Sequence, residues 1–377
     1  MLESFNCDTS IERTQASFLK RLKPFQNIVL VVSEKTLKER AQTFKWLEKG
    51  LSKQSLSWIT LDLPLEERSL LNALNQLKAV ACDAVVALGG GAVLDGAKLL
   101  SFLYPYEEDR VKTILKSRAL PQNHEMGPPV HVIPTSLKCE SSVNRLVYVY
   151  DAYERLSYGL AHPHLLPASV LLDLELIATL PKERGLFQAF DTLVTLTDGI
   201  FFREEDRAQF ASHFQSTLQA MEAYHQGDVD EGLKGLIQTA MMLGQHQDAS
   251  KSTPLTIIQD SFMSLNPQLP IGVALRALWI PYCEVLADSP NAEVLGLLAP
   301  LFHLDVAGMT VHEQAQTVVT RLREWMRPFV MTRTELSVFQ LSEEIISDTV
   351  SHVVLTHPDF TLFDEETLSL MMEKMFI

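Results

Sequence analysis

The stretch from residue 84 to residue 104 constrains the fold of this chain most. Five apolar residues, Ala84 to Leu88, run directly into three consecutive glycines, Gly89-Gly90-Gly91, and a helix-like segment follows. A short apolar run of this kind is typical of a buried parallel strand. Glycines let the backbone approach a ligand closely, and the helix after them directs free N–H groups and a positive dipole end toward an anion. The pattern predicts a phosphate-cradling turn, with a tight turn that holds no ligand as the alternative.

Strand-like and helix-like segments alternate around this turn. The pattern predicts strands at residues 27–32, 56–61, 84–88, 131–133, 143–150 and 170–172. A β-α-β-α order indicates a parallel sheet with helices on both faces. Beyond Leu180, apolar residues recur at helical spacing and β-branched runs become rare. We therefore predict an α/β domain with a parallel sheet over residues 1–178, followed by an all-α domain over residues 179–377.

Composition restricts the class of protein and its partners. A chain of 377 residues with 46% hydrophobic and 21% charged residues is expected to form two globular domains. The formal net charge of -15 argues against a nucleic-acid partner. The four cysteines are far apart without a CxxC pair, which argues against a disulfide framework or a zinc knuckle. Because the N-terminus is polar and no apolar run approaches about 20 residues, we expect a cytoplasmic protein with no membrane partner.

The run from Gly89 to Lys98 reads GGGxxxDxxK and carries a family resemblance. It resembles the signature of the superfamily that joins iron-containing alcohol dehydrogenases, glycerol dehydrogenases and dehydroquinate synthases. Six further segments resemble that superfamily in the same order: residues 30–37, 133–136, 158–167, 172–176, 189–193 and 270–274. The resemblance spans most of the chain. It implies a Rossmann-like domain, a helical domain and an active site in the cleft between them.

The resemblance also implies a nicotinamide cofactor along the glycine loop. The residues it assigns to the cofactor are Gly89, Gly90, Gly91, Asp95 and Lys98, with Pro134, Thr135 and Ser136 on the nicotinamide side. Glu34 matches an acidic position after the first strand, where a carboxylate bonds the adenosine ribose and repels a 2′-phosphate. We therefore expect NAD rather than NADP, with NADP left open. An exposed first-turn acid is an equally good interpretation of Glu34.

The ligands of the family's metal are largely missing. Active members hold iron or zinc with one carboxylate and two or three histidines, and the ion acts as a Lewis acid. Asp191 matches the carboxylate, whereas Thr195, Ile257, Ser261 and Ile271 stand at the histidine positions. Isoleucine cannot ligate a metal, and a lone carboxylate holds zinc or iron weakly. We expect no tightly bound divalent ion, and Asp191 then has the alternative role of capping a helix after Gly185.

Other polar residues offer chemistry without a metal. Glu140 falls near an acidic position that glycerol dehydrogenases and dehydroquinate synthases use beside the substrate. Lys138 and Arg145 supply positive charge close by, which can polarise a carbonyl. The alternative is that these are ordinary loop residues. Glu140, Lys138 and Asp191 are therefore our candidate catalytic residues.

Three hypotheses follow for the function. The first is an NAD(P)-dependent oxidoreductase that acts on a small alcohol, aldehyde or ketone with a degenerate metal site. The second is a catalytically inactive family member that binds a nucleotide for regulation, and the third is a cyclase like dehydroquinate synthase. The glycine loop supports the first two equally, and we adopt the first. The oligomeric state stays open, with a homo-oligomer as one alternative.

Overall fold

The computed structural model describes residues 9–39, 41–246, 253–266, 271–328, 343–357 and 360–374. Its contacts divide the chain into two compact units. The first unit comprises residues 1–185 and 222–251, and the second comprises residues 186–221 and 252–377. The chain therefore passes between the units three times, and the single boundary near residue 178 stays a prediction.

The first unit is built on a six-stranded sheet in which every pair of neighbouring strands is parallel. The strand order is β1-β8-β5-β4-β2-β3. Its strands are β1 (Ser10–Glu12), β2 (Asn27–Ser33), β3 (Ser55–Leu61), β4 (Ala84–Gly89), β5 (Val130–Pro134) and β8 (Ser169–Leu171). Two further strands, β6 (Leu146–Asp151) and β7 (Leu156–Ala161), form a separate antiparallel hairpin. The parallel sheet confirms the predicted fold class of the N-terminal part.

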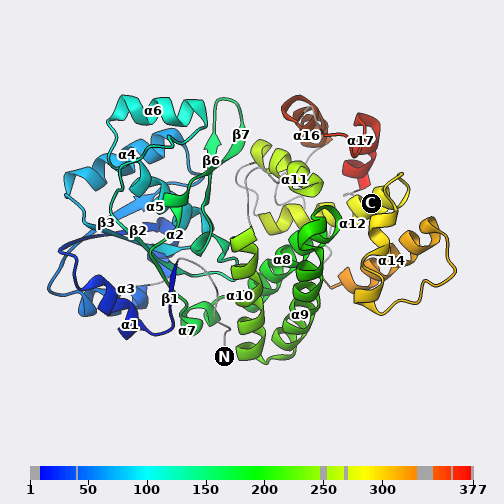
Figure 1. The fold of residues 1–377 in the computed structure, drawn as a ribbon, viewed down its shortest axis with the longest axis horizontal. Helices are drawn as coiled ribbons and strands as arrows, with labels where there is room; N and C mark the ends of the chain where they lie inside the picture. Colours follow the sequence, from blue (N-terminus) through cyan, green and yellow to red (C-terminus); the bar gives the residue numbers. More distant parts are fainter. Residues whose placement is uncertain are drawn as a thin grey trace. The chain divides into compact units, whose positions relative to one another are not determined.

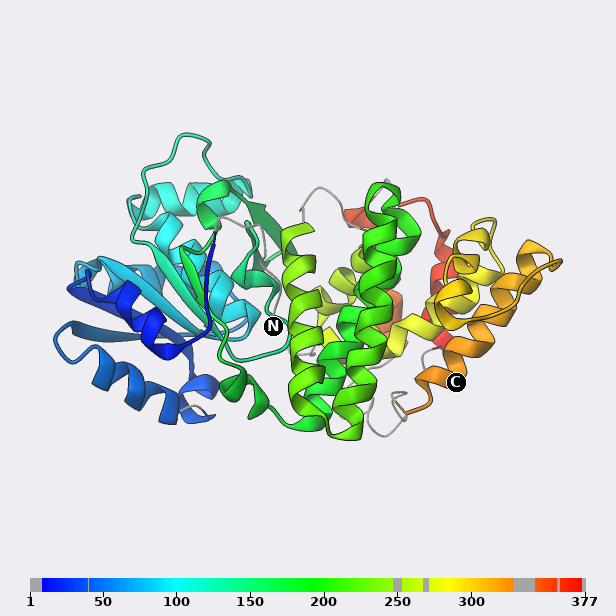
Figure 2. The same ribbon diagram turned by 60° about the horizontal axis from the view of Figure 1, so that its bottom comes forward.

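Helices cover both faces of the sheet (Figures 1 and 2). On one face, α1 (Gln15–Leu22), α3 (Ala41–Gly50) and α7 (Leu174–Ala178) contribute to a core with the inward residues of β2 and β4. On the other face, α5 (Gly91–Leu103) packs on β2, β4 and β5, and α4 (Glu67–Ala79) packs on β3 and α5. Helix α6 (Glu108–Ser117) lies against α4. Because β2 and β4 are covered on both faces, they read as continuous apolar runs rather than as alternating ones.

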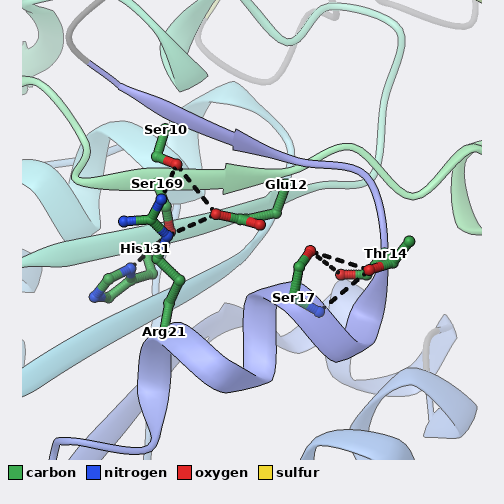
Figure 3. A network of polar contacts seen from close by, with 7 residues as sticks. All are labelled: Ser10, Glu12, Thr14, Ser17, Arg21, His131 and Ser169. Carbon is green, nitrogen blue, oxygen red and sulfur yellow. Dashed lines mark hydrogen bonds and ion pairs between the residues drawn. The ribbon is translucent and has the colours of Figure 1, made fainter.

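Strand β1 is the one strand of the six-stranded sheet that the sequence pattern does not predict. It has three residues, and two of them, Ser10 and Glu12, are polar. Arg21 of α1 holds both, with a 2.6 Å ion pair to Glu12 and a hydrogen bond to Ser10 (Figure 3). On the neighbouring strands, His131 Nδ1 lies 2.7 Å from the Ser169 hydroxyl. Polar side chains therefore fix an edge that carries no hydrophobic signal.

Among the residues that the structure describes, the second unit contains helices and no strand. It contains most of α8 (Lys182–Phe202) and α9 (Arg207–Gln226). The other helices are α11 (Pro254–Leu265), α12 (Ile271–Ala287), α13 (Glu293–Gly296), α14 (Val311–Met326), α16 (Glu343–Thr356) and α17 (Glu365–Glu373). Helix α10 (Val229–His246) belongs to the first unit. Within the described ranges, no helix has the length and apolar character needed to cross a bilayer.

Candidate functional site

The strand order places the glycine turn at a special point of the sheet. From β2 the chain moves outward to β3, and it then returns to form β4 on the other side of β2. Crossovers that leave in opposite directions open a crevice at the carboxyl ends of the two central strands, where open α/β sheets bind ligands. Strand β2 ends at Ser33, and β4 ends at Gly89. The predicted cofactor turn therefore lies at this crevice.

Two glycines near the turn are needed by the packing of the protein itself. A methyl group on Gly89 would lie 2.7 Å from Cβ of Val93, in the first turn of α5. A methyl group on Gly96 would lie 2.5 Å from Cδ1 of Leu61 at the end of β3. These approaches are far shorter than ordinary van der Waals contact. Gly89 and Gly96 thus let α5 lie close to the sheet.

The next two glycines have no such steric reason. A methyl group on Gly90 would have Ser136 Oγ as its nearest neighbour at 4.0 Å, and one on Gly91 would have Ser141 Oγ at 3.4 Å. Gly90 has an ordinary extended backbone, with φ of −81° and ψ of 179°. Both residues are partly exposed, and no side chain caps the helix that begins at Gly91. The space over Gly90 and Gly91 is therefore open to a ligand, with two hydroxyl groups at its rim.

The segment after β5 lies directly beside this turn. Pro134 is the register partner of Gly89, and the Thr135 N–H donates a 3.0 Å hydrogen bond to the Gly89 carbonyl. The Ser136 hydroxyl donates to the Lys138 carbonyl over 3.0 Å. The structure thus brings together the glycine loop and the Pro134–Ser136 segment that the sequence assigned to one cofactor site.

Lys98 is a fully buried cation whose protons are used by the protein. Its Nζ donates to the side-chain oxygen of Asn144 at 2.6 Å and to the carbonyls of Leu146 at 2.7 Å and Ser141 at 3.2 Å. The Asp95 carboxylate lies 3.2 Å from the same Nζ. Burial lowers the pKa of Lys98, and the nearby Asp95 opposes that shift. These contacts favour a structural tie between α5 and residues 141–146 over a direct contact with phosphate.

Asp95, like Lys98, is buried and makes its contacts within the protein. Its Oδ2 accepts a long hydrogen bond, 3.4 Å, from the Tyr148 N–H in β6, and its Oδ1 faces Lys98 without hydrogen-bond geometry. Together Asp95 and Lys98 fasten the β6–β7 hairpin and the preceding turn to α5. The motif GGGxxxDxxK therefore combines an open turn with a clamp, and the predicted contacts of Asp95 and Lys98 with a cofactor stay a prediction.

Glu140 begins the short helix η1 (Glu140–Ser142), which packs on α5 and β5. Its side chain is buried, and burial raises the pKa of its carboxyl, while Lys138 partly offsets the shift. Helix α10 approaches η1 so closely that a methyl group on Gly244 would lie 2.5 Å from the Glu140 carbonyl oxygen. A buried carboxyl with a raised pKa is suited to proton transfer. Lys138 is half-buried beside it.

Glu34 lies at the same edge of the sheet as the glycine turn. It opens α2 (Glu34–Glu39), which follows β2 directly and is capped by the Ser33 hydroxyl. Its exposed carboxylate accepts a 2.6 Å hydrogen bond from Lys38, which lowers the pKa of Glu34. The carboxylate is therefore ionised and accessible at the carboxyl end of β2. The ribose contact assigned to it stays a prediction.

The residues at the metal positions lie in the helical unit. Asp191 is buried in the interior of α8, which begins at Lys182, so the alternative that it caps a helix after Gly185 is wrong. The helix runs through Gly185, where an added methyl group would lie 2.7 Å from the Tyr224 hydroxyl oxygen. Glycine at position 185 thus reflects close packing and does not mark a helix end.

The residues that the resemblance matches to the metal ligands do not suit a divalent ion. Thr195 lies one turn along α8 and donates its hydroxyl to the Asp191 carbonyl at 2.9 Å. Ile257 and Ser261 lie on α11, and the side chain of Ile271 is outside the described residues. In the part of the chain that the structure describes, no three His, Cys, Asp or Glu side chains are grouped as metal ligands. Hydroxyl and alkyl groups bind zinc or iron poorly, so these residues do not fit the family's metal.

Three residues of this architecture were missed by sequence reasoning. Asn144 accepts the shortest hydrogen bond of Lys98. Gly244 lacks a side chain and so lets η1 pack closely on α10. An isolated glycine inside an apolar helical pattern, as at position 244, is a signal of close packing that was available. Arg276 of α12 is buried with only 8% of its surface exposed, and a buried arginine is rare enough to merit attention.

Comparison with known proteins agrees with this geometry. Residues 11–174 match the model of the iron-containing alcohol dehydrogenase family. The match covers less than half of the chain, so it shows similarity to this family over the α/β part. The chain is 29% identical to probable alcohol dehydrogenase EutG of Salmonella typhimurium over 123 residues, which cover 32% of this chain and 30% of EutG. It is 22% identical to choline dehydrogenase of Bacillus subtilis over 278 residues, or 71% of this chain and 65% of that protein. The matches thus span less than two thirds of either relative.

Solved structures of alcohol dehydrogenases share the whole fold. NADH-dependent butanol dehydrogenase A of Thermotoga maritima superposes with a TM-score of 0.80 at 15% identity, over 100% of this chain and 98% of the other. A 1,3-propanediol oxidoreductase superposes with a TM-score of 0.78 at 15% identity, over the full length of both chains. At this identity the likeness concerns the fold. It confirms the predicted order of an α/β part followed by a helical part.

Proposed function

We propose that this relative of the alcohol dehydrogenases binds a nicotinamide dinucleotide at the glycine turn and acts as an oxidoreductase on a small alcohol, aldehyde or ketone. The open space over Gly90 and Gly91 carries the proposal. Because the folded protein has no steric need for glycine at either position, a closely approaching ligand is the physical reason for both. A methyl group there would fill the place that a phosphate occupies.

The groups around the turn suit a diphosphate. The uncapped N-terminus of α5 offers free N–H groups and a positive dipole end to an anion. The hydroxyls of Ser136 and Ser141 border the same space. Glu34, at the carboxyl end of β2, supports NAD over NADP because a carboxylate there repels a 2′-phosphate. When bound, the nicotinamide ring accepts or supplies a hydride.

Glu140 is the proposed proton-transfer group. Its buried carboxyl has a raised pKa, so it holds a proton closer to neutral pH than an exposed glutamate does. Reduction of a carbonyl requires a proton at the oxygen, and oxidation of an alcohol requires its removal. Lys138 sits near enough to lower the pKa of Glu140 partly and thus to support its ionised form. We infer that this pair works without a metal.

A titration with NADH and NADPH tests the proposal. The four tryptophans and the cofactor's own fluorescence report binding. We expect saturable binding that is tighter for NADH, followed by turnover of a small aldehyde or ketone that Glu140→Gln slows. Absence of binding for both cofactors would remove the dinucleotide site. A cytoplasmic location and self-association stay predictions, checked by fractionation and by light scattering.

One observation favours a second candidate function. The hydroxyl and alkyl side chains at the matched ligand positions do not suit the metal on which the family's chemistry depends. A chain that binds the dinucleotide but lacks turnover would act as a nucleotide-binding or regulatory protein. Binding of NADH without turnover of a broad panel of alcohols and aldehydes, with and without added zinc or iron, would select this candidate.

A further inference from the structure

Lys98 connects the helix that follows the glycine turn to the segment that carries Glu140. Its Nζ donates to the Ser141 carbonyl at 3.2 Å, to the Asn144 side-chain oxygen at 2.6 Å and to the Leu146 carbonyl at 2.7 Å. An ammonium group has three protons to donate, so these acceptors use all of them. The acceptors extend from η1 to the first residue of β6. One side chain of α5 thus holds the whole segment.

The burial of Lys98 indicates that its contacts matter more than the space it fills. The residue is 1% exposed, and its charge is balanced by the Asp95 carboxylate, 3.2 Å from Nζ. Burying an ammonium group is costly unless it is paired and hydrogen-bonded, and an apolar side chain of similar size avoids that cost. An apolar side chain cannot donate to the carbonyl oxygens of residues 141–146, however. Lys98 therefore serves the position of this segment.

Glu140 lies in the segment that Lys98 holds. Besides its contacts with α5, the helix η1 packs on α10, where a methyl group on Gly244 would lie 2.5 Å from the Glu140 carbonyl oxygen. The next residue, Ser141, has its hydroxyl oxygen 3.4 Å from the place of a methyl group on Gly91. The position of η1 therefore determines both the burial of Glu140 and one hydroxyl at the rim of the glycine turn.

The carboxyl of Glu140 is sensitive to the packing of η1. It is 7% exposed, and burial is the main cause of its raised pKa; Lys138 opposes the shift and Asp95 adds to it. The adjacent Cys139 thiol is also buried, and α10 contributes a glycine at its closest approach to η1. A pKa that is raised by burial falls when water reaches the carboxyl. The titration of Glu140 therefore reports whether η1 stays packed.

We propose that Lys98 is a positioning residue for the proton-transfer group: it holds η1 against α5 and thereby keeps Glu140 buried beside the glycine turn. The proposal rests on the proposed role of Glu140. It requires no contact between Lys98 and a cofactor, since the protein takes the protons of Nζ. Without the tie, water reaches Glu140 and the carboxyl loses its proton at lower pH. A lysine that only adds stability would leave this titration unchanged.

Infrared spectroscopy follows the titration of Glu140 without any need for turnover. The carbonyl stretch of a protonated carboxyl is recorded against pH, and the spectrum of Glu140→Gln identifies the signal. Asn144→Leu removes the shortest bond of Lys98 and keeps its pair with Asp95, whereas Asn144→Asp keeps an accepting oxygen. We expect Asn144→Leu to lower the Glu140 midpoint by at least one pH unit, a tenfold change in the protonation constant. Asn144→Asp should not lower it.

A second comparison removes Lys98 itself. Lys98→Met is combined with Asp95→Asn, so that no unpaired carboxylate remains, and is compared with Asp95→Asn alone. Loss of a positive charge by itself raises the pKa of a carboxyl, so a lower midpoint in the double variant reports entry of water. We expect a fall of at least one pH unit. Arg21→Met, which breaks the ion pair with Glu12 at strand β1, is the control for lost stability and should leave the midpoint in place.

The outcomes separate this proposal from the proposed function. An unchanged Glu140 midpoint in Asn144→Leu and in the Lys98→Met double variant, or an equal fall in Arg21→Met, would overturn the positioning role. Lowered midpoints in a protein that binds no NADH and shows no turnover would support the positioning of Glu140 by Lys98 while rejecting the oxidoreductase. Where turnover is found, the same variants should shift its pH profile by the same amount as the infrared midpoint.

Discussion

Replacing Gly90 or Gly91 by alanine is expected to separate folding from ligand binding. The added methyl group has its nearest neighbour at 4.0 Å on Gly90 and at 3.4 Å on Gly91, so neither clashes with the protein. Gly91 lies in the first turn of α5, where alanine is favoured over glycine by up to about 1 kcal/mol. The free energy of unfolding should therefore stay unchanged for Gly90→Ala and rise by about 0.5 kcal/mol for Gly91→Ala.

A neighbouring glycine supplies the matched control. A methyl group on Gly89 would lie 2.7 Å from Cβ of Val93. Cβ of Val93 sits on the helix backbone and cannot swing away, so the strand and helix must separate. Overpacking of this kind costs about 1–3 kcal/mol. Gly89→Ala should therefore destabilise the protein.

The affinity for NADH should fall in the same two variants, Gly90→Ala and Gly91→Ala, whose stability is kept or raised. A methyl group at position 90 or 91 takes the space that we assign to a phosphate, so NADH affinity should fall at least tenfold, or about 1.4 kcal/mol. Quenching of tryptophan fluorescence measures the affinity, and urea titration of the same samples measures stability. Wild-type affinity in both Gly90→Ala and Gly91→Ala would refute the reasoning, because the open space would then have no ligand to accommodate.

Three further perturbations probe buried titratable groups. Lys98→Met leaves Asp95 without its cation and should lower the free energy of unfolding by about 3–5 kcal/mol in urea; a loss below about 1 kcal/mol would contradict the clamp. Burial, with a smaller effect of Arg21, lowers the pKa of His131 from 6.5 to about 4. The folded protein therefore resists protonation there, and stability present above pH 6.5 should be lost as pH falls through 4, by on the order of 3 kcal/mol; His131→Gln should flatten this slope. Burial raises the pKa of Asp198 from 3.8 to about 6, so stability present below pH 3.8 should be lost as pH rises through 6. Asp198→Asn should remove that loss, as measured by urea titrations at pH 4 and pH 7.

The sheet and its glycine turn were predictable because their signals are local. A buried parallel strand must be apolar along its length, and β2 and β4 are both covered on two faces. Strand β1 lacked this signal because its pairing depends on Arg21, which lies nine residues after Glu12 and on another element. A polar three-residue edge cannot be told from a loop by periodicity.

For the candidate site too, local features were predictable from the sequence and contacts between distant residues were not. The sequence showed which residue types stand at positions 95 and 98, but it did not show their partners. The acceptors of Lys98 come from residues 141–146, more than forty positions later, and only the folded chain reveals that they use all its protons. Assignment of α10 to the α/β unit was equally out of reach, because it depends on the contact of Gly244 with Glu140.

The two units of the chain differ in how much of the resemblance to the dehydrogenases they keep. In the α/β unit, Gly90 and Gly91 keep a space that the protein does not need for its own packing. In the helical unit, the positions that the resemblance matches to metal-binding histidines hold hydroxyl and alkyl side chains. A protein that had lost its cofactor as well would gain stability from alanine at position 91 and would have no reason to retain glycine there. The open space over Gly90 and Gly91 therefore supports the proposal that the α/β unit binds a dinucleotide.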